Sequence, residues 1–300
     1  MSKANSYTNG VNNRVKVISP AKINLFLNVL KKRDDGYHEI ETVLQAIGLY
    51  DELSLIEINQ GVEVMSLEGV TPSGKANLIY QAANIILENC KIKKGVRIKL
   101  KKRIPVAAGL GGGSSNAAAT LVGLNELWKL NLSRTHLVEL AASLGSDVPF
   151  FISGGRAVGT GRGDKITSLA NWQHFWLILL IPKFSILTRH AYQNLNLINE
   201  RSQLKTVLSC LEGGNLEKAL YNRFEEVITK KYPVVGIMKD ELRSLGAEGA
   251  LMSGSGPAVF GVVRQRAHAE KIAMAVQREV VYVVKTSLEG VKVVKEKLLN

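Results

Sequence analysis

The sequence has very few cysteines, and this shortage excludes two kinds of stabilising site. Cys90 and Cys210 lie far apart in the chain and form no C-x-x-C pair. A disulfide framework or a structural zinc site needs several cysteines at characteristic spacings. We therefore interpret both residues as small, buried hydrophobic side chains in a protein of a reducing compartment.

Long hydrophobic runs are also missing. The most apolar stretch, "FWLILLI" at 175–181, is bounded by His174 and Pro182. A membrane-spanning helix needs about 20 apolar residues, so this stretch predicts a buried strand instead. The first twelve residues, "MSKANSYTNGVN", lack the apolar core of a secretory signal and predict a short disordered tail. We expect a cytoplasmic protein.

Acidic residues are in short supply. The 26 Asp and Glu residues face 39 Lys and Arg residues, which gives a formal net charge of +13. Such a balance favours anionic partners, whether nucleic acid, acidic lipid or phosphorylated metabolites. The densest basic run is "KIKKGVRIKLKKR" at 91–103, which contains no acidic residue. Two interpretations stay open for this run: a solvated basic face, or a strip that contacts phosphates.

The length of 300 residues suits two domains or one large one. The pattern of predicted strands and helices is interrupted near Ala170 and Asn171, which predicts a division into residues 14–168 and 169–300. Strands and helices do not alternate regularly, and this irregular order predicts an α+β fold rather than a doubly wound sheet. Strands are predicted at 15–30, 51–58, 95–105, 175–181, 249–252, 258–263 and 280–285, and helices at 74–90, 114–129, 133–145, 189–230 (several), 233–245 and 266–279. Residues 147–169 are interpreted as a loop followed by two strands.

A glycine-rich stretch, "PVAAGLGGGSSNAAAT" at 105–120, lies between a predicted strand and a predicted helix. Glycines let the backbone come close to a ligand, and free N–H groups at a helix start bind phosphates. The stretch lacks the lysine of a P-loop, and Ser114 stands where G-x-G-x-x-G requires its last glycine. We favour phosphate binding over a flexible turn because the strand, the helix and the basic run surround it.

Three polar residues outside this stretch are candidates for chemistry. Strand alternation places Lys22 and Asn24 on one face, which fits either an edge lysine that reaches solvent or a cation that faces a reacting oxygen. Asp147 precedes Val148-Pro149, which we interpret as an extended turn. This aspartate is either a local turn residue or a carboxylate that accepts a proton from an attacking hydroxyl.

In chain order, these pieces resemble the motifs of the GHMP superfamily of small-molecule kinases. The matching motifs are "PAKINL" (20–25), "GYH" (36–38), the glycine stretch, "GSDVP" (145–149) and "GSGP" (254–257). The resemblance runs from about Val15 to the C-terminus. It implies an α+β fold with a ribosomal-protein-S5-domain-2-like N-terminal half and a ferredoxin-like C-terminal half. Within the superfamily, "PAKINLFLNV" and "DGYH" are similar to the branch that acts on a cytidine-diphosphate-linked methylerythritol.

The resemblance implies an ATP-dependent kinase that phosphorylates the 2-hydroxyl of this acceptor in non-mevalonate isoprenoid biosynthesis, with Mg²⁺. Lys22 and Asp147 match the catalytic lysine and aspartate, so the lysine missing from the glycine loop would come from the first motif. The implied ATP-binding residues are Pro105, Val106, Ala107, Ala108, Gly109, Leu110, Gly111, Gly112, Gly113, Ser114 and Ser115, with Asn77 and Lys102 near the adenine. The implied acceptor-binding residues are Asn24, Tyr37, His38 and Tyr192.

Two alternatives remain at this point. The same fold could phosphorylate another alcohol, such as homoserine or mevalonate, and Tyr37-His38 argues against it because those acceptors carry no base to stack. A basic nucleic-acid-binding protein could use 91–103 as its phosphate contact, although the resemblance implies no nucleic acid and no membrane partner. No His, Cys and carboxylate cluster has metal-ligand spacing, so the metal ligands are unknown.

Overall fold

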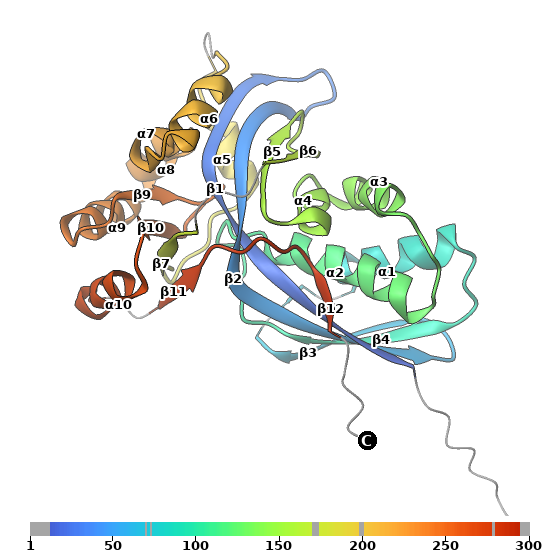
Figure 1. The fold of residues 1–300 in the computed structure, drawn as a ribbon. Helices are drawn as coiled ribbons and strands as arrows, with labels where there is room; N and C mark the ends of the chain where they lie inside the picture. The colour runs from blue at the N-terminus through green and yellow to red at the C-terminus, as the bar shows by residue number, and fades with distance from the viewer. Residues whose placement is uncertain are drawn as a thin grey trace, which may run out of the picture.

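The computed structural model describes residues 13–69, 71–72, 74–169, 174–197, 201–277 and 280–294 (Figure 1). Two expectations lie outside these residues: the disordered tail at 1–12 and the boundary at Ala170 and Asn171. The division into 14–168 and 169–300 therefore stays a prediction.

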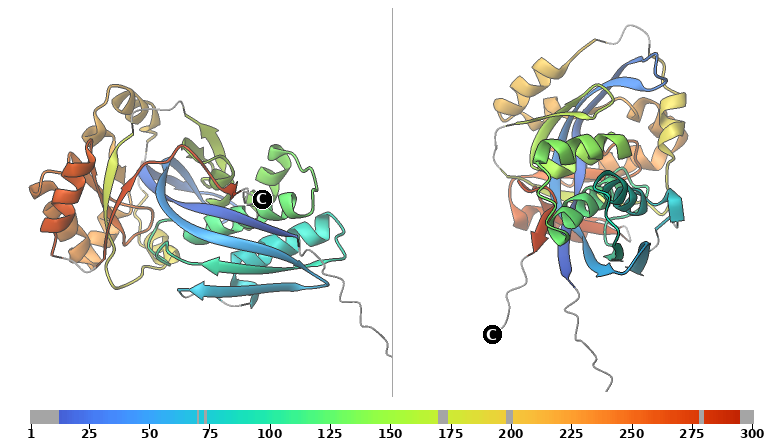
Figure 2. Two further views of the ribbon diagram at one scale, coloured as in Figure 1. Left: turned by 60° about the horizontal axis from the view of Figure 1, so that its bottom comes forward. Right: turned by 90° about the vertical axis from the view of Figure 1, so that its right-hand side faces the viewer.

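A large sheet is built on two long antiparallel strands, β1 (Arg14–Lys32) and β2 (His38–Ile58). Among the described residues it has eight strands, with the main order β12-β1-β2-β4-β3. β1 and β2 extend beyond the rest of this sheet and run up to the second half of the chain (Figures 1 and 2). The other members are β3 (Val62–Glu68), β4 (Gly95–Lys101), β5 (Arg156–Thr160), β6 (Lys165–Ser168), β8 (Tyr221–Asn222) and β12 (Lys292–Val294).

Helices of the first half cover one face of this sheet. They are α1 (Leu78–Asn89), α2 (Gly112–Leu127), α3 (Arg134–Leu144) and α4 (Val148–Ser153), preceded by a short 3₁₀ turn at Gly74–Ala76. Ser133 caps α3 by accepting a hydrogen bond from the His136 N–H, and Gly145 follows its last residue, as the sequence predicts. The apolar side of β4 packs beneath α1 and α2, and it consists of Val96, Ile98 and Leu100.

The second half forms a smaller sheet with the order β11-β7-β10-β9 and antiparallel neighbours. Numbered along this half, the order is 4-1-3-2, which is that of a ferredoxin-like βαββαβ unit and confirms the expected architecture. Its strands are β7 (Trp176–Leu180), β9 (Gly249–Met252), β10 (Val259–Val263) and β11 (Val281–Lys285). Its helices are α5 (Thr188–Gln193), α6 (Leu204–Glu212), α7 (Leu216–Ala219), α8 (Glu225–Lys231), α9 (Pro233–Ser244) and α10 (Arg266–Ala275).

Strand β7 shows why "FWLILLI" is apolar at consecutive positions. Leu177 and Leu179 face a core shared with the long strands, whereas Ile178 and Leu180 face the core beneath α9 and α10. A strand buried on both faces has no polar alternation. The predicted buried strand is confirmed, and no described helix is long and apolar enough to cross a membrane.

The interpretation of Val148-Pro149 as an extended turn is wrong. Both residues lie in α4, where the proline occupies the first helical turn. Proline is tolerated there because the first helical N–H groups have no partner within the helix. The helix buries Phe150 and Phe151 against the core, and this burial outweighs the extended preference of a residue before proline.

The basic run 91–103 coincides largely with β4, which lies between β2 and β3. Four of its basic side chains form ion pairs with carboxylates on the neighbouring strands. The pairs are Lys94–Glu57, Arg97–Glu63, Lys102–Asp51 and Arg103–Glu52. Carboxylates therefore balance half of the positive charges in this run, and only the Lys102–Asp51 pair among these four is buried.

Candidate active site

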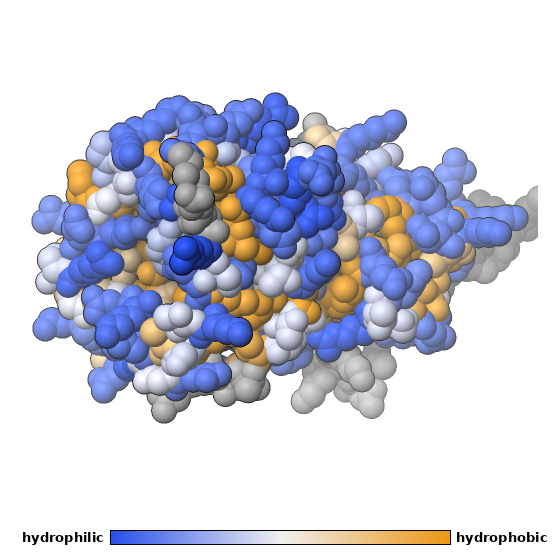
Figure 3. Space-filling view, turned by 90° about the horizontal axis from the view of Figure 1, so that it is seen from above, coloured by the Kyte–Doolittle hydropathy of each residue, from blue (hydrophilic) through white to orange (hydrophobic). Residues whose placement is uncertain are grey.

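The predicted site residues, apart from Ser115, line one cavity of about 1400 Å³ between the two halves of the chain. Single drug-sized ligands occupy about 300–1,000 Å³, so this cavity has room for two sizeable molecules. Figure 3 shows one face of the molecule, on which hydrophilic residues predominate and apolar residues show in separate areas. Among the described residues that line the cavity, five are lysines or arginines and one, Asp147, is acidic; the basic ones are Lys22, Lys32, Lys102, Arg162 and Arg189.

Lys22 and Asn24 share the inward face of β1, as strand alternation predicts. The Lys22 ammonium donates a 2.7 Å hydrogen bond to Asn24 Oδ1, and Asn24 Nδ2 donates one of 2.8 Å to Thr42 Oγ1 on β2. Lys22 is 3% exposed, which excludes an edge lysine that reaches solvent. Burial lowers the pKa of Lys22, and the nearby carboxylate of Asp147 opposes that shift.

Asp147 lies at the N-terminus of α4, with its carboxylate open to the cavity. Its Oδ2 atom is 3.7 Å from Lys22 Nζ, and its side chain is 41% exposed. Although the residue has the position of a helix cap, its side chain makes no capping hydrogen bond. The carboxylate is therefore positioned to accept a proton from a hydroxyl bound in the cavity.

The glycine loop is held tightly against the strands around it. A Cβ atom built on Gly109 would lie 2.0 Å from the Ser253 carbonyl oxygen, and one on Gly111 would lie 3.0 Å from Lys22 Cγ. Both glycines have positive φ angles, which side chains disfavour. Ser253 Oγ donates a 3.0 Å hydrogen bond to the Gly109 carbonyl, so the second glycine loop supports the first.

Asp51 is a site residue that sequence reasoning missed. This fully buried carboxylate, near the middle of β2, joins the end of β4 to the start of α2. Oδ1 accepts the backbone N–H groups of Arg103 and Ile104, at 2.7 and 2.8 Å. Oδ2 accepts Lys102 Nζ at 2.5 Å and Asn116 Nδ2 at 2.9 Å. A lone aspartate in the strand pattern "DELSLIEI" gives no signal of this role.

Two predicted nucleotide residues have other partners in the structure. Asn77 lines the cavity, but its side chain caps α1 by accepting the Ile79 N–H and donates to the Pro72 carbonyl. Ser115 is fully buried, and its hydroxyl accepts a 2.7 Å hydrogen bond from Ser19 Oγ. Of the predicted loop, 105–114 lines the cavity and Ser115 turns toward the core.

Four aromatic residues, Tyr37, His38, Tyr192 and Phe224, line the cavity. His38 and Tyr192 stack with ring centroids 4.7 Å apart, and Tyr192 packs edge-on against Phe224. Burial, followed by the charge of Lys32, lowers the pKa of His38 below 6.5, which favours a neutral imidazole. Tyr37 is 53% exposed, with its ring free to receive another flat group. The "GYH" segment of the β1–β2 hairpin and the "TRHAY" segment of α5 thus both contribute side chains to one aromatic cluster.

The chain is similar to known kinases in sequence and in structure. Residues 77–155 match the family model for the GHMP kinases N terminal domain, and residues 207–282 match that for the GHMP kinases C terminal. A protein of Bacillus subtilis (strain 168) named 4-diphosphocytidyl-2-C-methyl-D-erythritol kinase is 44% identical over 264 residues, 86% of this chain and 91% of that protein. A crystal structure of 4-(cytidine 5'-diphospho)-2C-methyl-D-erythritol kinase is 34% identical, with a TM-score of 0.78 over 90% of this chain and 98% of that one.

A homoserine kinase structure from Cytophaga hutchinsonii ATCC 33406 has a TM-score of 0.75 at 21% identity and covers 97% of this chain and 100% of that one. This likeness shows the fold alone. The fold, the glycine loop and the two matching family models define a GHMP kinase. Within that class, the chain belongs to the family of 4-diphosphocytidyl-2-C-methyl-D-erythritol kinases.

Proposed function

We propose that this protein transfers the γ-phosphoryl group of ATP to the 2-hydroxyl of 4-diphosphocytidyl-2-C-methyl-D-erythritol. The products are the 2-phosphate and ADP, and the reaction belongs to non-mevalonate isoprenoid biosynthesis. The proposal depends mainly on one arrangement within a single cavity. Lys22 adjoins the glycine loop, where a Cβ on Gly111 would lie 3.0 Å from its Cγ, and it pairs with Asp147 at 3.7 Å. Asp147 in turn lies near the aromatic cluster, because burial and then the charge of Asp147 raise the pKa of Tyr192. This arrangement fits a phosphate donor at the glycine loop and a base-carrying acceptor at the aromatic cluster.

The glycine loop is suited to the triphosphate of ATP. The backbone can approach phosphates closely at Gly109 and Gly111, where no side chain would fit. Helix α2 begins at Gly112, and neither a side-chain cap nor an acidic first-turn residue competes with an anion there. Lys102 Nζ would lie 2.7 Å from a Cβ on Gly112, and its charge is paired with the buried Asp51, so we keep Lys102 with Asn77 as a residue near the adenine. We assign 105–114 to the phosphates and Asn77 to the neighbourhood of the adenine.

Mg²⁺ would be carried mainly by the nucleotide. Among the described residues, no group of three or more His, Cys, Asp or Glu side chains could hold a metal ion. The ion would neutralise phosphate charge, and Ser114 at the start of α2 is the hydroxyl best placed to reach it. Mg²⁺ in phosphoryl transfer commonly keeps several waters and binds through substrate phosphates.

Asp147 and Lys22 act on the acceptor hydroxyl. Asp147 takes the proton as the 2-oxygen forms its bond to the γ-phosphorus, and the bond from that phosphorus to the β–γ bridging oxygen breaks to release ADP. Lys22 stabilises the negative charge that develops on the acceptor oxygen. Asn24 holds the lysine head in place from the other side. Positioning and charge neutralisation supply most of the rate in such a reaction.

The aromatic cluster supports the cytidine acceptor over a small alcohol. Tyr37, His38 and Tyr192 offer flat surfaces and a polar ring edge in the cavity. Homoserine and mevalonate carry no base that would use them. Ion pairs with strand carboxylates balance half of the positive charges of the basic run, which weakens the argument for a nucleic-acid-binding protein.

A coupled ADP assay tests the proposal. The protein is given ATP and Mg²⁺ with 4-diphosphocytidyl-methylerythritol, homoserine or mevalonate in parallel. We expect turnover with the cytidine compound alone. Turnover with either other alcohol instead would retain the kinase and refute the cytosine assignment of Tyr37 and His38.

A further inference from the structure

The β5–β6 turn, residues 160–164, borders the cavity next to the β1–β2 hairpin. Its sequence "TGRGD" places a glycine on each side of Arg162, and both glycines have positive φ angles, +69° at Gly161 and +92° at Gly163. The turn is attached to β2, because the Ile40 N–H donates a 2.8 Å hydrogen bond to the Gly161 carbonyl. Its backbone therefore directs one basic side chain toward the hairpin.

Arg162 is fixed by its neighbour in the turn. Its Nη2 and Nε atoms lie 2.9 and 3.2 Å from Asp164 Oδ2, and its backbone N–H donates to Asp164 Oδ1 at 3.2 Å. The guanidinium carbon lies 4.8 Å from the centroid of the Tyr37 ring. A guanidinium within about 6 Å of an aromatic face is attracted to it. The arginine thus covers one face of the ring.

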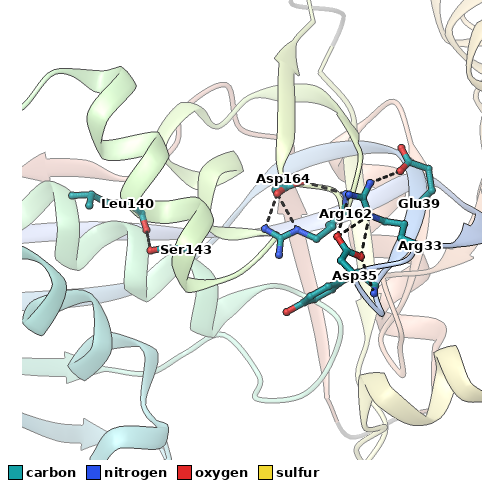
Figure 4. Close-up of polar contacts among 8 residues, drawn as sticks. Arg33, Asp35, Glu39, Leu140, Ser143, Arg162 and Asp164 are labelled. Carbon is teal, nitrogen blue, oxygen red and sulfur yellow. Dashed lines mark hydrogen bonds and ion pairs between the residues drawn. The ribbon is translucent and has the colours of Figure 1, made fainter.

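The hairpin fixes the backbone of Tyr37 with a charge network of its own. The Tyr37 N–H donates to Asp35 Oδ1 at 3.1 Å, and the Arg33 N–H donates to the Tyr37 carbonyl at 2.8 Å. Arg33 also pairs with Asp35 and with Glu39. Figure 4 shows these hairpin side chains beside Arg162 and Asp164 of the β5–β6 turn. The backbone of the tyrosine is anchored, and its side chain is 53% exposed.

We propose that Arg162 is a positioning residue for the base of the acceptor: by holding one face of the Tyr37 ring, it presents the other face as a preformed stacking surface. This inference rests on the proposed function, because it needs an acceptor that carries a base. A ring that is ordered before the ligand arrives reduces the conformational entropy lost on binding. Arg162 then contributes to affinity for the acceptor and does not affect the phosphoryl-transfer step.

Steady-state kinetics of four full-length proteins test this inference: wild type, Arg162→Gln, Tyr37→Leu and the double variant. A cation–π contact at an exposed site corresponds to about a two- to fivefold change in an equilibrium constant. We expect Arg162→Gln to raise KM for 4-diphosphocytidyl-methylerythritol by that factor, with kcat and KM for ATP unchanged. In the Tyr37→Leu background the same substitution should change nothing further. Arg162→Lys, which keeps the charge, should restore most of the loss.

Arg266→Gln is the matched control. Arg266 also pairs with a carboxylate, Glu270, and lies over an aromatic ring, Trp176, but it does not line the cavity. Its kinetics should equal those of the wild type, and thermal unfolding should show that every variant is folded. Calorimetric titration with cytidine 5'-diphosphate should show the same loss of affinity in Arg162→Gln without any turnover.

The outcomes separate the two proposals. Wild-type turnover combined with an unchanged KM in Arg162→Gln overturns the inference alone. So does an equal rise in KM when Tyr37 is already leucine, because the arginine would then contact the acceptor directly, at its diphosphate. Absence of wild-type turnover with the cytidine acceptor overturns the proposed function and the inference with it.

Discussion

Lys22 Nζ and Asp147 Oδ2 lie 3.7 Å apart, although one residue comes from β1 and the other from the start of α4. The lysine is buried and the aspartate faces the cavity, so solvent screens the charge of the aspartate more than that of the lysine. Burial lowers the pKa of Lys22, and Asp147 supports its charged form. A change at Asp147 therefore alters the ionisation of Lys22.

Asp147→Asn should lower kcat about 10²- to 10⁴-fold, the usual contribution of a general base. The substitution also removes the group that raises the pKa of Lys22, so the alkaline loss of residual activity should begin at a lower pH. The pH profile of kcat in the coupled ADP assay measures both effects. A variant with nearly wild-type kcat would show that no base is needed in the transfer step.

Gly109→Ala should disrupt the phosphate loop. The added Cβ would lie 2.0 Å from the Ser253 carbonyl oxygen at a φ of +79°, and a non-glycine residue in that region costs about 1–3 kcal/mol. We expect a higher KM for ATP and a lower unfolding temperature. Gly236→Ala in α9 is the control, because a Cβ there meets nothing within 4 Å. It should stabilise the protein by about 0.5–1 kcal/mol. Equal behaviour of both variants in chemical denaturation would refute this account of the loop.

Asp51→Asn should destabilise the protein by about 3–5 kcal/mol, because it leaves the buried charge of Lys102 without its partner. Burial already lowers the pKa of Lys102, and loss of the carboxylate lowers it further. The folded state then binds fewer protons than the unfolded state, so the stability of this variant should rise with pH up to the ordinary lysine value of 10.5. Urea unfolding across this pH range measures the effect.

Glu52→Gln is the matched control for Asp51→Asn. Glu52 is the next residue along β2, and its ion pair with Arg103 is exposed, with side chains 43% and 53% accessible. Breaking an exposed pair costs at most about 1 kcal/mol. A large loss of stability in Glu52→Gln, or none in Asp51→Asn, would contradict the role assigned to the buried carboxylate.

His38 should make acceptor binding sensitive to acid. Burial and then Lys32 lower its pKa, so the imidazole stays neutral to a pH below the ordinary value of 6.5. KM for the cytidine acceptor should be constant above that value and rise as the pH falls through the lowered pKa. His38→Gln, whose side chain cannot titrate, should lose this rise in KM at low pH. A rise in KM that persists in the variant would assign the titration to another group.

The sequence predicted the parts of the fold that follow from local pattern. The alternation of Val96, Ile98 and Leu100 and the two-sided apolarity of 175–181 were sufficient for β4 and β7. The short α4 helix was missed because the local preference of Val148 before proline disagrees with the burial of two phenylalanines, and burial depends on the tertiary fold. β3 and the short strands β8 and β12 were not predicted, because pairing with distant residues defines them.

For the candidate site, motif resemblance located the residues that line the cavity but not their supports. Lys22, Asp147, Tyr37 and His38 stand in recognisable short patterns. Asp51 and Arg162 stand in an ordinary strand and an ordinary glycine turn. Their partners, Lys102 and Tyr37, are distant in sequence, so only the folded structure brings these pairs together.

The position of the transferred phosphate tests the central claim most directly. The protein is incubated with ATP, Mg²⁺ and 4-diphosphocytidyl-2-C-methyl-D-erythritol, and the product is followed by phosphorus NMR with coupling to the acceptor carbons. The account predicts a new phosphomonoester on the 2-oxygen that accumulates in step with ADP and forms about 10²- to 10⁴-fold more slowly with Asp147→Asn. A phosphate on another hydroxyl, or ADP formed without any phosphorylated acceptor, would contradict it.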